Sequence, residues 1–468
     1  MTALNGIAVW TGPVLLGALA MRVAAGAPDA PLLVLAAVVA PLVALLQRPT
    51  TERPHPVSAG AIVISATLIL GASFVPLGDA AQLLGARRWQ GVVLAAALLL
   101  LLTLSPRARS WRAGALVIGG TALVLCLVTL AATARAPWHA WRDVATRPAL
   151  VFGARSPWVT SGGWFARRAT LAFDEGHRIV VVEPGTFRVV EQEGTSHVVR
   201  EWRLRAGDAL TLRPGDRLNV EAGSRLRFEA GKRVPGAAAS GAVWAEAGTA
   251  PLVASLAGVA TLVLGAISLV PAAGRRGFAA PATLLALALA AACWGIYAVA
   301  TVPDVLLGGS LAEPLLRLPA ATSGGRALAA LAAVALLALF LAAAGALHDR
   351  VTALAAARGT TVWMAAVAVA AVGSLFSLDP WLLLTAGLGF AAATIAGPRL
   401  AAGSARPRAW PVEAIGAVAG GVAFVGIVAL GPRVPSALSA LAESPALPAA
   451  FVSWLAVKLL RWSAPLRS

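Results

Sequence analysis

Long apolar stretches separated by short polar ones make up most of this chain. About 20 apolar residues of helix are needed to cross a bilayer core about 30 Å thick. The segment must be helical because hydrocarbon offers no hydrogen-bond partner, so the backbone groups must pair with one another. The pattern therefore predicts a polytopic α-helical membrane protein with about 12 transmembrane helices. The predicted spans are 4–21, 30–46, 58–77, 91–104, 114–134, 251–273, 279–301, 327–347, 361–377, 380–397, 411–431 and 446–462.

One stretch, 135–250, departs from this pattern. From Arg178 onward, β-branched or alternating runs follow one another, separated by Gly-containing turn signals. They predict an inserted all-β domain between a five-helix transmembrane bundle, 1–134, and a seven-helix bundle, 251–468. The six expected strands are 178–183, 186–192, 196–205, 209–213, 217–221 and 225–229.

An eight-residue repeat lies within the β-rich stretch, at 207–231. Each unit opens with glycine and carries two apolar residues two positions apart, which suits one buried sheet face. Folding back at Gly215 and Gly223 would place Leu212 opposite Leu218, and Arg217 opposite Glu229, so we expect an antiparallel meander. A β-solenoid rung is the alternative, although three units are barely enough for one.

Composition agrees with a membrane protein and excludes several other classes. Of the 468 residues 59% are hydrophobic and 13% are charged, whereas a soluble domain carries about 25% charged residues. The two cysteines, Cys126 and Cys293, both fall in apolar runs. We therefore expect free buried thiols, and neither a disulfide framework, a metal site nor a bound cofactor.

The distribution of lysine and arginine predicts the orientation in the membrane. With the N-terminus inside, cytoplasmic segments hold fifteen of these residues and the short outer loops hold six. We expect a bacterial-type inner (plasma) membrane protein with both termini cytoplasmic and 135–250 extracytoplasmic. The net charge of +17 then reflects topology and a mildly basic outer domain, and no nucleic-acid partner is expected.

Two features near the membrane surface are candidate contacts. Trp138 and Trp141 flank His139 just after the fifth span, where indole rings prefer the headgroup level, so we interpret them as interfacial anchors. A basic cluster in the outer domain is a candidate site for anionic headgroups or an acidic partner, with a solvated surface as the alternative. The cluster consists of Arg225, Arg227, Lys232 and Arg233.

The predicted spans carry almost no ionisable groups, which argues against a proton- or sodium-driven carrier. Small residues are abundant instead, including Gly416 and Gly420 one helical turn apart. This spacing is typical of tight helix packing, within the chain or against a partner.

A membrane-embedded transferase would need an outward-facing carboxylate as a base. In the C-terminal half the candidates are Asp304, Glu313 and Asp379, together with Glu443. A helix cap or turn residue is the alternative role of each.

Three functions remain open. The first is a non-catalytic integral inner-membrane subunit that presents its β domain to other membrane or extracytoplasmic proteins in an envelope assembly. It follows from nearly uncharged spans and an outer domain without catalytic motifs. The second, a transporter or flippase for a lipid-linked substrate, predicts a polar cavity between the two helical halves. The third is a membrane-embedded glycosyl or lipid transferase.

Overall fold

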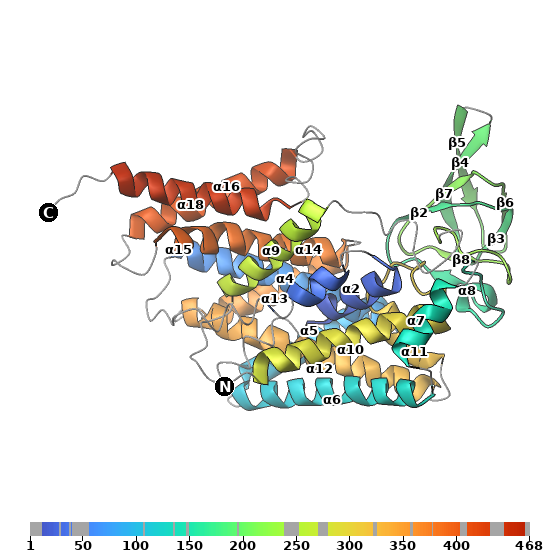
Figure 1. Ribbon diagram of the computed structural model, residues 1–468, viewed down its shortest axis with the longest axis horizontal. Coiled ribbons are helices and arrows are strands. Elements are labelled where there is room, and N and C mark those ends of the chain that lie inside the picture. The colour runs from blue at the N-terminus through green and yellow to red at the C-terminus, as the bar shows by residue number, and fades with distance from the viewer. Residues whose placement is uncertain are drawn as a thin grey trace.

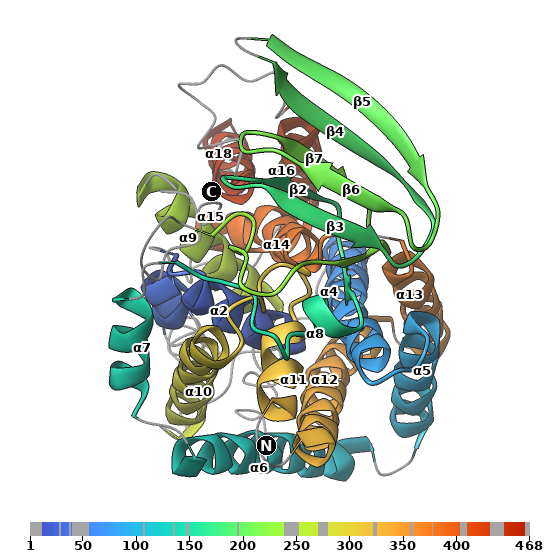
Figure 2. The same cartoon turned by 90° about the vertical axis from the view of Figure 1, so that its right-hand side faces the viewer.

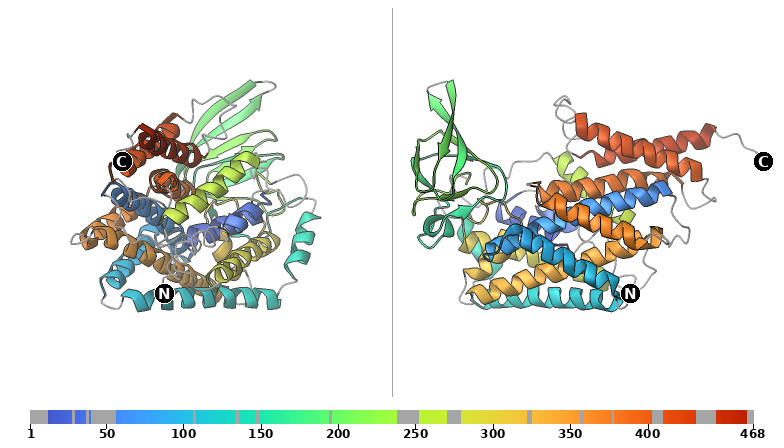
Figure 3. Two further views of the ribbon diagram at one scale, coloured as in Figure 1. Left: turned by 60° about the vertical axis from the view of Figure 1, so that its left-hand side comes forward. Right: turned by 180° about the vertical axis from the view of Figure 1, so that it is seen from behind.

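The computed structural model describes residues 12–27, 30–36, 39, 56–105, 108–133, 136–146, 149–193, 196–237, 252–269, 279–321, 325–355, 359–376, 378–402, 410–430 and 444–463. Long helices pack into a bundle, and a small β region lies at one end of it (Figure 1). Seen from behind, most of the helices run lengthwise with the β region beyond their ends (Figure 3). The β region therefore caps the bundle and does not cover its side.

The helices follow the apolar stretches, which are rich in alanine and leucine, residues of high helix propensity. Those of the bundle are α2 (Pro13–Ala24), α4 (Pro56–Leu83), α5 (Arg88–Leu104), α6 (Ala108–Thr133), α9 (Leu252–Leu269), α10 (Ala279–Thr301), α12 (Gly325–Ala355), α13 (Gly359–Ser374), α14 (Pro380–Ala391), the π-helix η3 (Ala392–Ala396), α15 (Gly397–Ala402), α16 (Trp410–Leu430) and α18 (Ala446–Ser463). Three shorter helices, α7 (Pro137–Ala145), α8 (Pro157–Thr160) and α11 (Glu313–Ala320), lie between them in the chain.

Three helices in the described part of the chain are long and apolar enough to cross a membrane. They cover Pro56–Leu83, Gly325–Thr352 and Val412–Leu430, and several shorter apolar helices accompany them. The predicted fold class is thus confirmed in its coarse form, a mostly helical protein with candidate membrane spans and a small β region. The count of twelve spans stays a prediction, and the spans 4–21 and 30–46 lie partly outside the described residues.

The outer helix faces expose large apolar side chains. Leu101 on α5 is 69% exposed and Val422 on α16 is 68% exposed, and valines, leucines and isoleucines on α6, α13 and α18 are similarly exposed. Contiguous apolar surface of this kind is rare on soluble monomers and suits contact with acyl chains. These faces agree with membrane association.

Two four-stranded antiparallel sheets form the β region (Figure 2). The six predicted strands are present as β3 to β8, and two short strands, β1 and β2, precede them. One sheet has the order β1 (Gly163–Trp164), β8 (Arg225–Arg227), β3 (His177–Val181) and β6 (Ala209–Leu212). The other has the order β2 (Ala169–Ala172), β7 (Arg217–Val220), β4 (Gly185–Glu193) and β5 (Ser196–Leu204).

The predicted meander over 207–231 is wrong. Consecutive repeat units enter alternate sheets, so Leu212 pairs with His177 and Leu218 pairs with Leu171. Each unit crosses to the opposite sheet at its glycine turn, where Gly215, for example, has a φ of +92°. The antiparallel pairing also contradicts the solenoid alternative. The predicted inward face is nevertheless confirmed, because the apolar pairs of all three units are buried: Leu210, Leu212, Leu218, Val220, Leu226 and Phe228.

Glycines on α16 allow its close approach to η3 and α18. A Cβ on Gly420 would overlap the carbonyl oxygen of Ala393, and the Ser453 hydroxyl donates a hydrogen bond of 2.7 Å to the carbonyl of Gly416. Carbonyl oxygens and backbone cannot move aside as a flexible side chain can. The small-residue spacing therefore serves packing within the chain.

We expect Gly420→Leu to destabilise the bundle by about 1–3 kcal/mol, the usual range for overpacking. Gly426→Leu on the same helix is the matched control, since nothing lies within 4 Å of a Cβ there. Thermal unfolding in detergent should separate the two variants. Equal melting temperatures would contradict the proposed contact.

Candidate functional site

The β region is attached to the bundle near α8 and the loop that precedes α11. The Ala166 N–H donates a hydrogen bond of 2.8 Å to the carbonyl of Gly308. Nearby, Arg167 pairs with Asp379 at 3.0 Å, and the carboxylate of Asp379 also caps α14 by accepting the Trp381 N–H. Asp379 thus holds the β region to the bundle as well as capping a helix.

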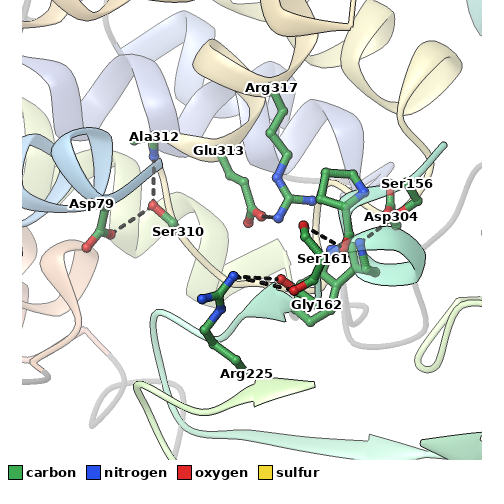
Figure 4. Close-up of polar contacts among 12 residues, drawn as sticks. Asp79, Ser156, Ser161, Gly162, Arg225, Asp304, Ser310, Ala312, Glu313 and Arg317 are labelled. Carbon is green, nitrogen blue, oxygen red and sulfur yellow. Dashed lines mark hydrogen bonds and ion pairs between the residues drawn. The ribbon is translucent and has the colours of Figure 1, made fainter. Parts of the chain in front are cut away.

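Asp304 is a second link across this junction. It is 1% exposed and accepts a hydrogen bond from the hydroxyl of Ser156 (Figure 4). That hydroxyl in turn accepts the Trp158 N–H at 3.1 Å, so Ser156 is the N-cap of α8. Asp304 is therefore buried and engaged, and its position on the outer side of the membrane stays a prediction.

Glu313 is also buried, at 1% exposure, and pairs with Arg317 one helical turn later at 2.5 Å. The guanidinium of Arg317 lies over the indole of Trp158, 5.5 Å from the ring centroid. Gly308 leaves room for the Glu313 carboxylate, since a Cβ there would lie 2.5 Å from Oε2. Glu313 is thus buried and paired, and its position on the outer side of the membrane stays a prediction. The fourth candidate, Glu443, lies outside the described residues.

Burial controls the ionisation of Glu313. It raises the pKa of this carboxyl from 4.5 to about 8, because the charged form loses its hydration. The positive charge of Arg317 opposes the shift, whereas the carboxylates of Asp304 and Asp79 add to it. Near neutral pH, Glu313 is therefore mostly protonated, and Arg317 is only weakly neutralised.

Asp79 is a buried carboxylate that the sequence reasoning missed. The predicted third span ends at position 77, whereas α4 continues to Leu83 and buries Asp79 to 2% exposure. Its carboxylate pairs with Arg88 at 3.3 Å and accepts the Ser310 hydroxyl at 2.8 Å. The sequence offered one sign of this buried carboxylate, a single acidic residue directly after an apolar run.

A cleft of about 470 Å³ opens beside these groups, between the bundle and the β region. The turn that follows α4, residues 82–86, forms one wall. Leu316, Arg317 and Ala320 of α11 form another, and β-region residues including Glu183 and Arg225 close it. The cleft therefore has walls from both predicted helical halves and from the β region.

Two arginines and one carboxylate are the charged groups of the cleft lining. Arg225 pairs with Glu183 at 3.3 Å and reaches the carbonyls of Ser161 and Gly162 at 3.5 Å (Figure 4). The Arg317 side chain is only 10% exposed, and its Nη1 has no hydrogen-bond partner among the residues that the structure describes. A buried donor of this kind is costly unless an acceptor meets it. The lining is thus suited to an anion.

The structure separates the predicted basic cluster. Arg225 lines the cleft, whereas the described lining does not include Arg227, Lys232 or Arg233. Arg227 is exposed, and Arg233 pairs with Asp174 at 3.2 Å elsewhere in the β region. Because strand pairing decides which of these residues face the bundle, their closeness in sequence was misleading.

The two predicted anchors lie on α7. Trp138 is exposed and Trp141 is half-buried against the core. Both cysteines are free, as expected. The described residues contain no group of three or more His, Cys, Asp and Glu side chains that could hold a metal ion.

The chain matches no known family model, and no curated protein sequence is similar to it. Its function therefore has to be argued from the cleft and its charges.

Proposed function

We propose that this protein is an integral membrane transporter or flippase that binds the anionic headgroup of a lipid-linked substrate in the cleft. The observation that carries the proposal is Arg317, which lines a cleft of about 470 Å³ and whose buried Nη1 has no hydrogen-bond partner among the described residues. Ligand sites of this volume are typical for small molecules and headgroups. The walls come from the two helical halves, as an alternating-access site would require.

The proposed setting is a bacterial-type inner membrane crossed about twelve times, with both termini cytoplasmic. The excess of basic residues in the predicted cytoplasmic segments supports this orientation. The turn after α4, helix α11 and the β region all line the cleft, so all three lie on the same side of the membrane. In this orientation the cleft lies at the outer membrane surface, within reach of outer-leaflet lipids.

A second candidate function is a non-catalytic subunit that presents the β region to another membrane or extracytoplasmic protein. It is favoured by β5, which among the described strands pairs with β4 alone and forms the outer edge of its sheet (Figure 2). Val199 and Trp202 on this strand are 64% and 40% exposed. An open edge with apolar side chains is a common docking mode for an added strand.

The transferase alternative has less support. Asp304, Glu313 and Asp379 are each engaged by a serine or an arginine, which leaves them poorly placed as bases. The carboxylate that does line the cleft, Glu183, pairs with Arg225.

The proposal predicts that Arg225→Gln and Arg317→Gln weaken binding of phosphatidylglycerol roughly 10- to 100-fold, since each removes a charge-assisted contact. Arg227→Gln, two residues along β8 and outside the cleft lining, is the matched control and should bind normally. Native mass spectrometry can compare phosphatidylglycerol with phosphatidylcholine of equal chain length.

Three outcomes would count against the proposal. Equal binding of the two lipids contradicts an anion site, and equal loss in all three variants contradicts this location. Equally tight binding of soluble glycerophosphoglycerol contradicts a lipid-linked substrate. Specific binding without movement of fluorescent phosphatidylglycerol between leaflets of reconstituted vesicles would favour the subunit function.

A further inference from the structure

Arg317 is shared between two sites. On one side its Nη2 contacts the carboxylate of Glu313 at 2.5 Å. On the other side the same residue lines the cleft, with its Nη1 unpartnered. One residue thus borders both a buried carboxyl and the cleft where an anion would bind.

The position of Arg317 is restricted by its surroundings. The indole of Trp158 lies against its guanidinium, and α11 packs against α10 and α12. With so little room to turn, the guanidinium cannot fully neutralise Glu313 and a bound anion together. The two acidic groups therefore compete for one cation.

Other charged groups around Glu313 are already paired. Asp79 on α4 is neutralised by Arg88, and Asp304 in the preceding loop holds Ser156. On the β region Arg167 pairs with Asp379, and Arg225 with Glu183. The remaining charged residues and histidine on the helices that pack against α11 are Arg22 of α2, which has its own interaction, and four residues of α12. Arg326 lies at the exposed start of α12, and His348, Asp349 and Arg350 lie in its last turns, where His348 contacts Asp349 at 3.5 Å.

We propose that an anionic headgroup displaces Glu313 from Arg317, and that Glu313 takes up one proton from solvent as the headgroup binds. This inference rests on the proposed function of the cleft. The exchange applies at alkaline pH, where Glu313 is ionised before binding and its carboxylate pairs with Arg317. Afterwards the headgroup oxygens accept from the guanidinium, and the proton resides on a Glu313 carboxylate oxygen. The total charge of the buried site is conserved.

The direction of the pH dependence follows from the ionisation of Glu313. Because burial raises its pKa to about 8, the carboxyl is mostly protonated below that pH and does not compete for Arg317. Above that pH, the ionised carboxylate pairs with the guanidinium of Arg317 and competes with the ligand. When Arg317 pairs with a ligand instead, Glu313 loses the interaction that lowers its pKa. The pKa of Glu313 therefore rises further in the bound state.

The test is phosphatidylglycerol binding to the full-length detergent-solubilised protein between pH 6.5 and 9.5. A phosphodiester keeps one negative charge throughout, so the ligand does not titrate. We expect a constant affinity up to about pH 8 and then a decrease approaching tenfold per pH unit, the slope for one linked proton. Glu313→Gln, which cannot ionise, should bind with pH-independent affinity, whereas Glu183→Gln should keep the pH dependence.

Calorimetry on the unmodified protein gives a second readout, which does not depend on a variant folding. Titration at pH 9 in buffers of different ionisation enthalpy should show uptake of about one proton per bound lipid. No proton uptake, or the same slope in Glu313→Gln, overturns the exchange while leaving the cleft site intact. Absence of phosphatidylglycerol binding at every pH overturns the proposed function and this inference together.

Discussion

The substitution Asp79→Ala is expected to lower the free energy of unfolding of the bundle by about 3–5 kcal/mol, the range for breaking a buried ion pair. Asp79 neutralises Arg88 at 3.3 Å and accepts the Ser310 hydroxyl at 2.8 Å, with 2% of its surface exposed. Alanine would leave the guanidinium of Arg88 and the hydroxyl of Ser310 without this acceptor, in a largely buried position. Unfolding of the detergent-solubilised protein by heat or by sodium dodecyl sulfate measures the change.

Two further variants separate the charge from the hydrogen bond. Asp79→Asn keeps an oxygen for Ser310 but removes the charge, so an intermediate loss is expected. The double variant Asp79→Ala/Arg88→Ala should lose less stability than the sum of its single variants, because it leaves no unpaired charge. Additive losses, or a loss below about 1 kcal/mol for Asp79→Ala, would show that this pair contributes little.

The substitution Trp158→Ala is expected to destabilise the β region by about 3–5 kcal/mol and to loosen its attachment to the bundle. The fully buried indole lies 4.9 Å from the ring of Phe165 and 5.8 Å from that of Phe228. It also supports Arg317 across the junction. Faster cleavage of the β region by protease, with the helices still folded, would report the loosened attachment.

Trp202→Ala is the control for this prediction. Trp202 is also in the β region, but it lies on the edge strand β5 and is 40% exposed. Its loss should cost less than about 1 kcal/mol and leave protease resistance unchanged. Similar behaviour of the two tryptophan variants would mean that Trp158 has no special role at the junction.

The candidate site was only partly predictable. Charge and loop position identified Arg225, Asp304, Glu313 and Asp379, and all four lie at the junction. Their partners come from distant parts of the chain, so no local spacing could reveal them. Ser156, for example, binds an acid 148 residues away. Glu183, which lies between β3 and β4, was missed because nothing in the surrounding sequence marks it as facing the helices.

The repeat at 207–231 shows the same limit in the fold. Alternation of apolar and polar residues identifies the face that each strand buries, because side chains of a strand point to opposite sides in turn. It does not identify the neighbouring strand, since either sheet of a sandwich offers an equivalent apolar layer. Leu212 and Leu218 were correctly placed in the core and wrongly paired with each other.

The apolar helices, six of the eight strands and the buried faces of the repeat could be predicted from sequence, because these properties depend on neighbouring residues along the chain. Tertiary structure alone decided that Asp79, Asp304 and Glu313 are buried, and that Arg225 and Arg317 line one cleft. The reason is physical: the burial and charge balance of an ionisable group depend on what packs against it, and here those neighbours come from segments far apart in the chain.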